Sequence, residues 1–182
     1  MRNSGEHARS YYAATAATLT DYPRLEGEHR FDVVIVGGGF TGVSAMLFLA
    51  ERGYRVALME AHRIGWGASG RNGGQLIDGF VEERKIGKRL GAQAQDIAYR
   101  MGLECRDIVV QRIRQYSINC DLKFGYLDLA LRHSELDDFR ATRDERQRRS
   151  YPHDVRLVTG EALGDYIGSQ RYVGALVNSG NG

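Results

Sequence analysis

Apolar residues near the start of the chain fall into two short runs separated by a helical pattern. The run over residues 31–36 is continuous from Val33 onward, which predicts a parallel strand covered on both faces. Residues 41–52 carry apolar side chains at helical spacing, and Gly53 follows where a helix often ends in a left-handed turn. Residues 56–59 form the second run. This order of strand, helix and strand predicts a βαβ unit with two parallel strands.

A longer helical pattern covers residues 93–117. The stripe expected to be buried on this helix consists of Ile97, Met101, Ile108, Ile113 and Tyr116. Between the βαβ unit and this helix the chain is rich in glycine, which predicts a loop.

Shorter patterns complete the chain. Residues 124–131 alternate between apolar and polar, which predicts a half-buried strand. Its apolar face would carry Leu127, Leu129 and Leu131. Residues 134–149 predict a surface helix with Ser134 as its N-cap. Two further strand-like runs lie at 155–158 and 172–177.

Three glycines follow the first predicted strand in the pattern G-x-G-x-x-G. They are Gly37, Gly39 and Gly42. The first permits a tight turn, the second lets a diphosphate approach the backbone, and the third allows close packing of helix on strand. The N-terminus of the next predicted helix points at the expected diphosphate position, so the amides of Phe40 and Thr41 are the expected phosphate donors. In this context the pattern predicts a dinucleotide site rather than a plain glycine-rich turn.

Glu60 ends the second predicted strand, about twenty residues after the glycines. A carboxylate at that position can accept hydrogen bonds from both hydroxyls of a ribose. It would also repel a 2′-phosphate, so we expect a dinucleotide other than NADP.

A second glycine-rich segment, residues 63–76, follows this acid. A nicotinamide-binding domain usually continues with another helix and a third parallel strand, whereas this loop suits a larger cofactor that reaches toward a flavin ring. The candidate contacts in the loop are Ser69, Arg71, Asn72, Gly73 and Gly74. The serine offers a hydroxyl, the arginine a cation for phosphate or reduced flavin, the asparagine an amide, and the two glycines bare backbone. The alternative is a flexible surface loop with a structural arginine.

Composition and charge set further limits. The net charge of +2 implies no strong attraction to nucleic acid or to an anionic membrane. Two cysteines, and the lack of a signal-peptide core or of a span-length apolar run, favour a reduced cytoplasmic protein. The five histidines lack metal-like spacing, so no metal site is expected. Acids interleave with the arginines of residues 139–150, which favours a solvated helix face over a nucleic-acid patch.

The stretch from residue 32 to residue 76 resembles the FAD-binding start of the amine and amino-acid oxidases, the group of D-amino-acid oxidase, glycine oxidase and sarcosine oxidase. "SYYAATA" and "IGWGASGRNGGQ" together are most similar to the γ-glutamylputrescine oxidoreductase branch of that group. The similarity runs from about Ser10 to Val177. The block "GWGASGRNGGQ" is fairly specific, whereas the glycine fingerprint alone is not.

The resemblance implies an α/β fold in which a Rossmann-like βαβ FAD-binding domain joins an antiparallel α+β substrate domain. It implies oxidation of a C–N bond in a small-molecule amine or amino acid, with hydride transfer to flavin and oxygen as the acceptor. The residues that would line FAD are Gly37, Gly39, Phe40, Thr41, Gly42, Glu60, Ala61, Ser69, Arg71, Asn72, Gly73, Gly74 and Gln75.

Members of that group are much longer than this chain, and two parallel strands are too few for an ordinary doubly wound sheet. We therefore expect an N-terminal arm over 1–30, an incomplete FAD-binding domain over 31–120 and the start of a substrate domain over 121–182. Such a chain would be a fragment, inactive alone, or one part of a split enzyme with a separately encoded C-terminal half, and no catalytic residue is assigned. The alternatives are an NAD-linked dehydrogenase and a non-catalytic nucleotide-binding remnant.

Overall fold

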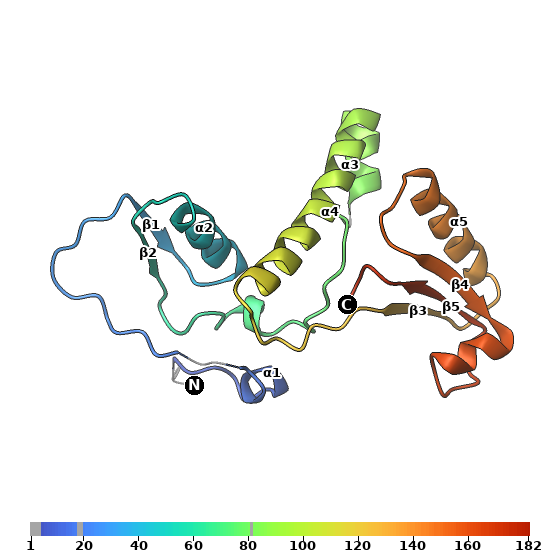
Figure 1. Ribbon diagram of the computed structural model, residues 1–182, viewed down its shortest axis with the longest axis horizontal. Coiled ribbons are helices and arrows are strands. Elements are labelled where there is room, and N and C mark those ends of the chain that lie inside the picture. Colours follow the sequence, from blue (N-terminus) through green and yellow to red (C-terminus); the bar gives the residue numbers. More distant parts are fainter. Residues whose placement is uncertain (1–4, 18–19, 81) are drawn as a thin grey trace. The chain divides into compact units, whose positions relative to one another are not determined.

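The computed structural model describes residues 5–17, 20–80 and 82–182. The chain folds as two compact units, one ending at Gly74 and the other beginning at Gln75. Figure 1 labels the helices and strands of both units. The domain boundaries expected from the sequence stay a prediction.

The first unit is built around the predicted βαβ arrangement. Strand β1 (Val33–Val36), helix α2 (Phe40–Ala50) and strand β2 (Val56–Met59) follow one another, and the two strands are parallel (Figure 1). Gly53 has φ +83° and lies in the turn after α2, as predicted. The βαβ unit is therefore confirmed.

The prediction that β1 is covered on both faces is wrong. Ile35 lies on the α2 side, because its Cγ2 is 3.4 Å from where a Cβ on Gly42 would stand. The opposite face carries Val34 and Val36, which are 57% and 86% exposed. Successive strand residues point to opposite faces, so one helix layer covers only alternate positions.

The rest of the first unit is a long arm and a glycine-rich loop. The arm carries the one-turn helix α1 (Tyr11–Ala14), whose Ala13 amide donates to the Ser10 hydroxyl at 3.2 Å. Residues 1–4 and 18–19 of the arm predicted over 1–30 lie outside the described residues. The loop after β2 contains a short 3₁₀ turn, η1 (Ala68–Gly70).

A three-stranded antiparallel sheet forms the centre of the second unit, in the order β3 (Tyr126–Ala130), β5 (Gly174–Asn178) and β4 (Val155–Thr159). Helix α5 (Glu135–Arg148) packs on the sheet (Figure 1). Every residue of β5 is buried because it is the middle strand. One core cluster consists of Val158, Leu163, Ala175 and Val177, with Leu163 contributed by the 3₁₀ turn η2 (Gly160–Asp165).

Two helices precede this sheet. Gly91 has φ +90° and separates helix α3 (Glu83–Leu90) from helix α4 (Ala92–Gln115). Helix α4 was predicted and α3 was not, because charged residues fill most of α3 and no apolar stripe marks it. No helix within residues 5–17, 20–80 and 82–182 is long and apolar enough to cross a membrane.

The buried stripe of α4 differs from the predicted one. It consists of Ala98, Gly102, Arg106 and Val110. The predicted stripe is largely exposed, with Ile97 at 44% and Met101 at 48%. The helix is close-packed, since a Cβ on Gly102 would stand 2.5 Å from the Cα of Gly79. Where Gly79 approaches, the small residues Ala98 and Gly102 therefore face inward, whereas hydrophobicity alone selects the larger neighbours.

Of two smaller predictions for the second unit, the placement of Leu131 is wrong and Ser134 as the N-cap residue of α5 is confirmed. Leu131 lies beyond the end of β3 and is 47% exposed, whereas Leu127 and Leu129 pack against the core as predicted. Ser134 occupies the N-cap position of α5 without a side-chain cap hydrogen bond. Instead, the Glu135 carboxylate accepts hydrogen bonds from the backbone amides of Leu131 and Arg132.

The basic stretch over 139–150 is not simply a solvated helix face. Arg146 is paired with the Asp78 carboxylate at 3.1 Å, and their side chains are 23% and 2% exposed. Arg149 is paired with Glu83 at 2.6 Å, and both side chains are largely buried. These arginines thus serve to hold the second unit together.

Candidate functional site

The glycine turn between β1 and α2 has the geometry that its sequence predicts. Gly37 has φ +105°, and its amide donates to the Met59 carbonyl at 2.7 Å. A Cβ on Gly42 would stand 1.9 Å from the Gly37 carbonyl oxygen. The first glycine thus supplies a conformation that other residues rarely adopt, and the last allows the helix to approach the strand.

The N-terminus of α2 follows this turn directly. Gly39 is its N-cap residue, and the Phe40 amide donates to the Ser69 hydroxyl at 3.0 Å. Ser69 also lies 2.9 Å from where a Cβ on Gly39 would stand. The serine hydroxyl accepts from Phe40 and keeps its own proton for a further acceptor. A phosphate oxygen at this helix end would therefore meet a hydroxyl donor as well as the helix dipole.

Glu60 lies against the same turn. Its Oε2 accepts a hydrogen bond from the Gly38 amide at 2.6 Å, and its Oε1 accepts one from the His62 amide at 3.0 Å. The hydrogen bonds from Gly38 first, and from His62 second, hold the pKa of the Glu60 carboxyl below its usual value. Each carboxylate oxygen has a second lone pair. The ionised side chain can thus still accept a ribose hydroxyl.

The loop after Glu60 folds back onto the glycine turn. The Gly65 amide donates to the Gly38 carbonyl at 2.8 Å. The loop is tight, since a Cβ on Gly70 would stand 2.2 Å from the Gly65 carbonyl oxygen. Within the loop, the Asn72 amide group donates to the Ser69 carbonyl at 2.8 Å and accepts from the Gly74 amide at 2.9 Å. Asn72 therefore braces the loop that carries Ser69.

Arg71 supplies the loop with a cation. Its Nε donates to the Trp66 carbonyl at 3.1 Å, and its guanidinium lies 4.8 Å from the centre of the Trp66 ring. Ala61 is exposed beside Glu60, whereas Gln75 is the first residue of the second unit. The structure thus gathers the glycine turn, Glu60 and Ser69 through direct contacts, and it gives no such contact for Gln75. That these residues bind a cofactor stays a prediction.

These residues fit the diphosphate end of a dinucleotide. A helix N-terminus with a glycine N-cap and a carboxylate at the end of the neighbouring strand are what a phosphate pair and its ribose require. The loop that carries Ser69 also holds the guanidinium of Arg71. In the part of the chain that the structure describes, no group of three His, Cys, Asp or Glu side chains could hold a metal ion.

Sequence reasoning missed one group of contacts beside this site. Glu6 and Asp21 of the arm both bind Arg63, and the Glu6 carbonyl accepts from the Trp66 indole. The partners lie between 42 and 60 positions apart, so no local pattern marks them. The one available signal was the unexplained arginine and tryptophan within the glycine-rich loop.

Comparisons with known proteins agree with this geometry. Residues 32–182 match the FAD dependent oxidoreductase family, DAO. The chain is 40% identical over 179 residues to "Probable oxidoreductase OrdL" of Haemophilus influenzae, and 36% identical over 178 residues to gamma-glutamylputrescine oxidoreductase of Escherichia coli. Each match covers 97% of this chain but only 41% and 42% of the relatives. The chain thus spans about two fifths of the length of these relatives.

Two solved structures have a similar fold. L-amino acid deaminase from Proteus vulgaris has a TM-score of 0.69 at 20% identity, with 90% of this chain and 36% of that chain covered. Glycine oxidase from Bacillus cereus has a TM-score of 0.62 at 24% identity, with 84% and 39% covered. These likenesses show the fold, and the family match extends over both units, from residue 32 to residue 182. The chain therefore belongs to the FAD dependent oxidoreductase family.

Proposed function

We propose that this chain carries the dinucleotide-binding turn of a flavoenzyme that oxidises a C–N bond in an amine or amino acid. The observation that carries the proposal is the Gly38 amide bound to the Glu60 carboxylate at 2.6 Å. It joins the expected phosphate turn and the expected ribose acceptor into one assembly. The family match favours FAD over the alternative of NAD.

Each part of the site has a distinct task in this proposal. The turn from Gly37 to Gly42 and the start of α2 would bind the diphosphate, and Glu60 would accept the adjoining ribose hydroxyls. Ser69 would donate to a phosphate oxygen, and Arg71 would balance negative charge. FAD, when bound, supplies a hydride acceptor.

The substrate that we propose is a γ-glutamylated amine. The support is the 36% identity to gamma-glutamylputrescine oxidoreductase over 97% of this chain. That enzyme is much longer, so we propose that polypeptide beyond these 182 residues, on the same or a separate chain, completes the substrate site. The cytoplasmic location stays a prediction.

Cofactor binding tests the site directly. Trp66 is the only tryptophan in the sequence and lies in the loop, so its emission should be quenched when FAD binds nearby. We expect Glu60→Gln to weaken FAD binding about tenfold, because it removes a charged hydrogen-bond acceptor. Glu28→Gln, at an exposed arm position, serves as the control and should leave the affinity unchanged. Equal affinity of the two variants, or no FAD binding by the parent chain, would overturn the proposed site.

The reaction is tested separately from cofactor binding. The FAD-loaded chain, alone and together with the part of a full-length relative that this chain does not match, is given γ-glutamylputrescine or putrescine under air. Peroxide release with the γ-glutamylated amine only, and only when the full length is present, is the expected result. Release with neither amine by the completed protein would refute the substrate assignment and leave the FAD site unaffected.

A further inference from the structure

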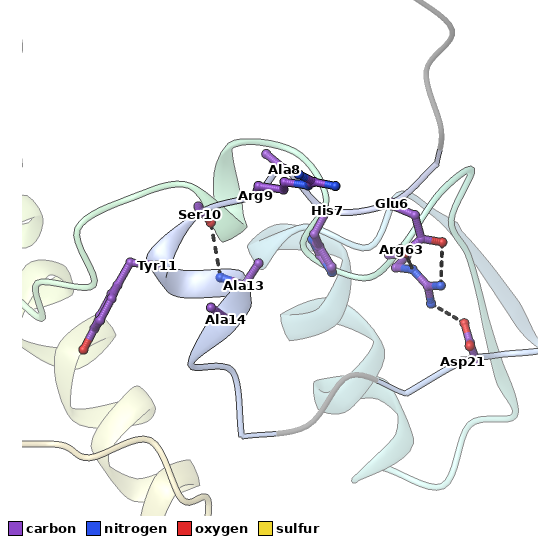
Figure 2. Close-up of a pocket in the computed structure, with 10 residues that line it drawn as sticks. All are labelled: Glu6, His7, Ala8, Arg9, Ser10, Tyr11, Ala13, Ala14, Asp21 and Arg63. Atoms are coloured by element: carbon purple, nitrogen blue, oxygen red, sulfur yellow. Dashed lines mark hydrogen bonds and ion pairs between the residues drawn. The ribbon is translucent and has the colours of Figure 1, made fainter.

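Arg63 is the centre of a polar clamp between the arm and the loop that follows Glu60. Its Nε and one terminal nitrogen donate to the two oxygens of the Glu6 carboxylate, both at 2.8 Å. The other terminal nitrogen binds the Asp21 carboxylate. Figure 2 shows both carboxylates directed at the guanidinium. The Arg63 side chain is 24% exposed, whereas the side chains of Glu6 and Asp21 are 61% and 85% exposed. The arm therefore shields Arg63 from solvent.

Trp66 provides a second attachment for the arm. Its indole nitrogen donates to the Glu6 carbonyl at 2.8 Å. Its ring lies 4.3 Å from the ring of His62, centre to centre. Glu6 thus contacts the loop through both its side chain and its backbone. Two attachments at one residue fix the direction of the arm relative to the loop as well as its distance from the loop.

The arm residues between these attachments line a hollow that is open to solvent. It has a volume of about 720 Å³ and is lined by residues 6–11, Ala13, Ala14, Asp21 and Arg63 (Figure 2). Helix α1 forms one wall. The arm is therefore a folded element seated on the loop rather than a loose extension.

The loop that the arm holds is the one that places Glu60. The His62 amide donates to the Glu60 carboxylate, and the Gly65 amide donates to the Gly38 carbonyl. His62 and Gly65 lie on either side of Arg63 in the sequence. The Trp66 amide donates to the Arg63 carbonyl at 2.9 Å, which closes the turn between them. A shift of Arg63 would move these neighbours and, with them, the carboxylate that faces the glycine turn.

We propose that the arm is a positioning element of the dinucleotide site: Glu6 and Asp21 hold Arg63, and Arg63 holds the loop that keeps Glu60 against Gly38. The inference rests on the proposed function, and it assigns to Glu6, Asp21 and Arg63 a role in cofactor affinity without contact with the cofactor. Isolated exposed ion pairs contribute little, but a bidentate arginine with a second carboxylate and a backbone bond forms a network. The two carboxylates also raise the pKa of the Arg63 guanidinium further above its usual range.

The test compares two double variants with the same change in charge. Glu6→Gln with Asp21→Asn removes both negative charges that face Arg63, whereas Glu26→Gln with Glu28→Gln changes two exposed residues of the same arm. Without FAD, the first variant should shift Trp66 emission to longer wavelength and should raise its quenching by iodide, because a weaker clamp lets the arm, with the residue 6 carbonyl that accepts from the indole, move away from the loop. With FAD, the dissociation constant should rise about fivefold. The control variant should match the parent in both measurements.

Two further readouts separate positioning from general destabilisation. Hydrogen exchange at the Gly38 amide should accelerate in the first variant, because this amide donates to Glu60, while exchange at the amides of β1 and β2 stays unchanged. In about 1 M NaCl the difference in FAD affinity between parent and variant should shrink, since salt screens exposed ion pairs. Faster exchange in the strands as well would indicate lost stability and would overturn the inference.

The outcomes also distinguish this inference from the proposed function. If the parent binds FAD and the first variant loosens Trp66 without any change in FAD affinity, the positioning role is refuted and the FAD site stands. If the parent binds no FAD, the proposed function fails, and the inference fails with it.

Discussion

In the first unit, Glu60 accepts two backbone hydrogen bonds at a partly exposed turn, whereas in the second unit the side chain of Asp78 is 2% exposed and is bound by Arg146 and Tyr151. Both carboxylates accept two or more hydrogen bonds. They differ in access to water and in the kind of donor. A backbone donor beside solvent can be shared with a ligand, whereas a partly buried guanidinium cannot leave its buried carboxylate partner without a large cost in free energy.

The same contrast extends to the residues around each carboxylate. Around Glu60, one donor is the Gly38 amide of the glycine turn, and the other is the amide of His62, two positions after Glu60. Around Asp78 the partners lie 68 and 73 positions away, on α5 and just after it, and Tyr151 also reaches Asn178 at 3.1 Å. We therefore infer that the first arrangement presents a site and the second acts as a scaffold. The predictions below test this difference from the largest expected effect to the smallest.

Removing the charge of Asp78 should have the largest effect. Asp78→Asn leaves the partly buried guanidinium of Arg146 without its counter-charge, so we expect the free energy of unfolding to fall by about 3 kcal/mol. Urea unfolding followed by far-ultraviolet circular dichroism measures this change. Asp137→Asn is the matched control because its partner Arg140 is 49% exposed, and it should change stability by about 0.5 kcal/mol or less. Similar losses in both variants would contradict the scaffold assignment.

In the first unit, the largest effect should come from packing rather than from charge. A Cβ on Gly42 would stand 1.9 Å from the Gly37 carbonyl oxygen, so Gly42→Ala must push α2 away from the turn. We expect a loss of about 2 kcal/mol in unfolding free energy, together with loss of FAD binding. Gly67→Ala is the control, because nothing lies within 4 Å of its Cβ position and its φ is −76°. Retained FAD affinity in the first variant would mean that close packing at this turn is not required.

The contrast between the units also explains how much the sequence could predict. The glycine turn and the position of Glu60 follow from a local motif, in which strand, turn and helix are adjacent along the chain. The clamp on Arg63 and the network around Asp78 join residues that are distant in sequence. Amphipathic periodicity carries no information about such pairs.

The α4 stripe shows a second limit of sequence reasoning. Hydrophobicity favoured Ile97 and Met101 as buried residues, but Ala98 and Gly102 face inward in the second unit. Helix burial there is decided by how closely Gly79 approaches, which requires a glycine opposite it. A pattern of side-chain polarity does not report backbone distance, so the helix was predicted correctly and its orientation was not.

Alkaline pH should weaken the second unit through Tyr151. Burial, and then the hydrogen bond to Asp78, raise the pKa of Tyr151 to about 12, against 10.0 for an ordinary tyrosine. Because the folded-state pKa is the higher one, the contribution is fully present below pH 10 and is lost as pH rises through about 12. Allowing for partial exposure, the loss should be about 1 kcal/mol. The groups that face the hydroxyl are Asp78, Asn178 and Arg146.

The unfolding free energy of the parent and of Tyr151→Phe, measured across this pH range, checks the prediction. The variant lacks the titrating hydroxyl, so its stability should fall less between about pH 10 and pH 12. An equal fall in both proteins would assign the alkaline loss to other groups.

Ser69→Ala should have the smallest effect on stability and a measurable effect on FAD affinity. The hydroxyl accepts from the exposed Phe40 amide at 3.0 Å, and water can replace it there, so the unfolding free energy without FAD should change by about 0.5 kcal/mol or less. The hydroxyl proton would donate to a phosphate oxygen, so FAD affinity should fall about fivefold, measured by quenching of Trp66. Asn72→Ala removes hydrogen bonds within the same loop and serves for comparison. Tighter FAD binding by the Ser69 variant would show that the serine hydroxyl competes with the phosphate for the Phe40 amide. The exposed hydrogen bonds of the first unit would then hinder FAD binding rather than prepare the site.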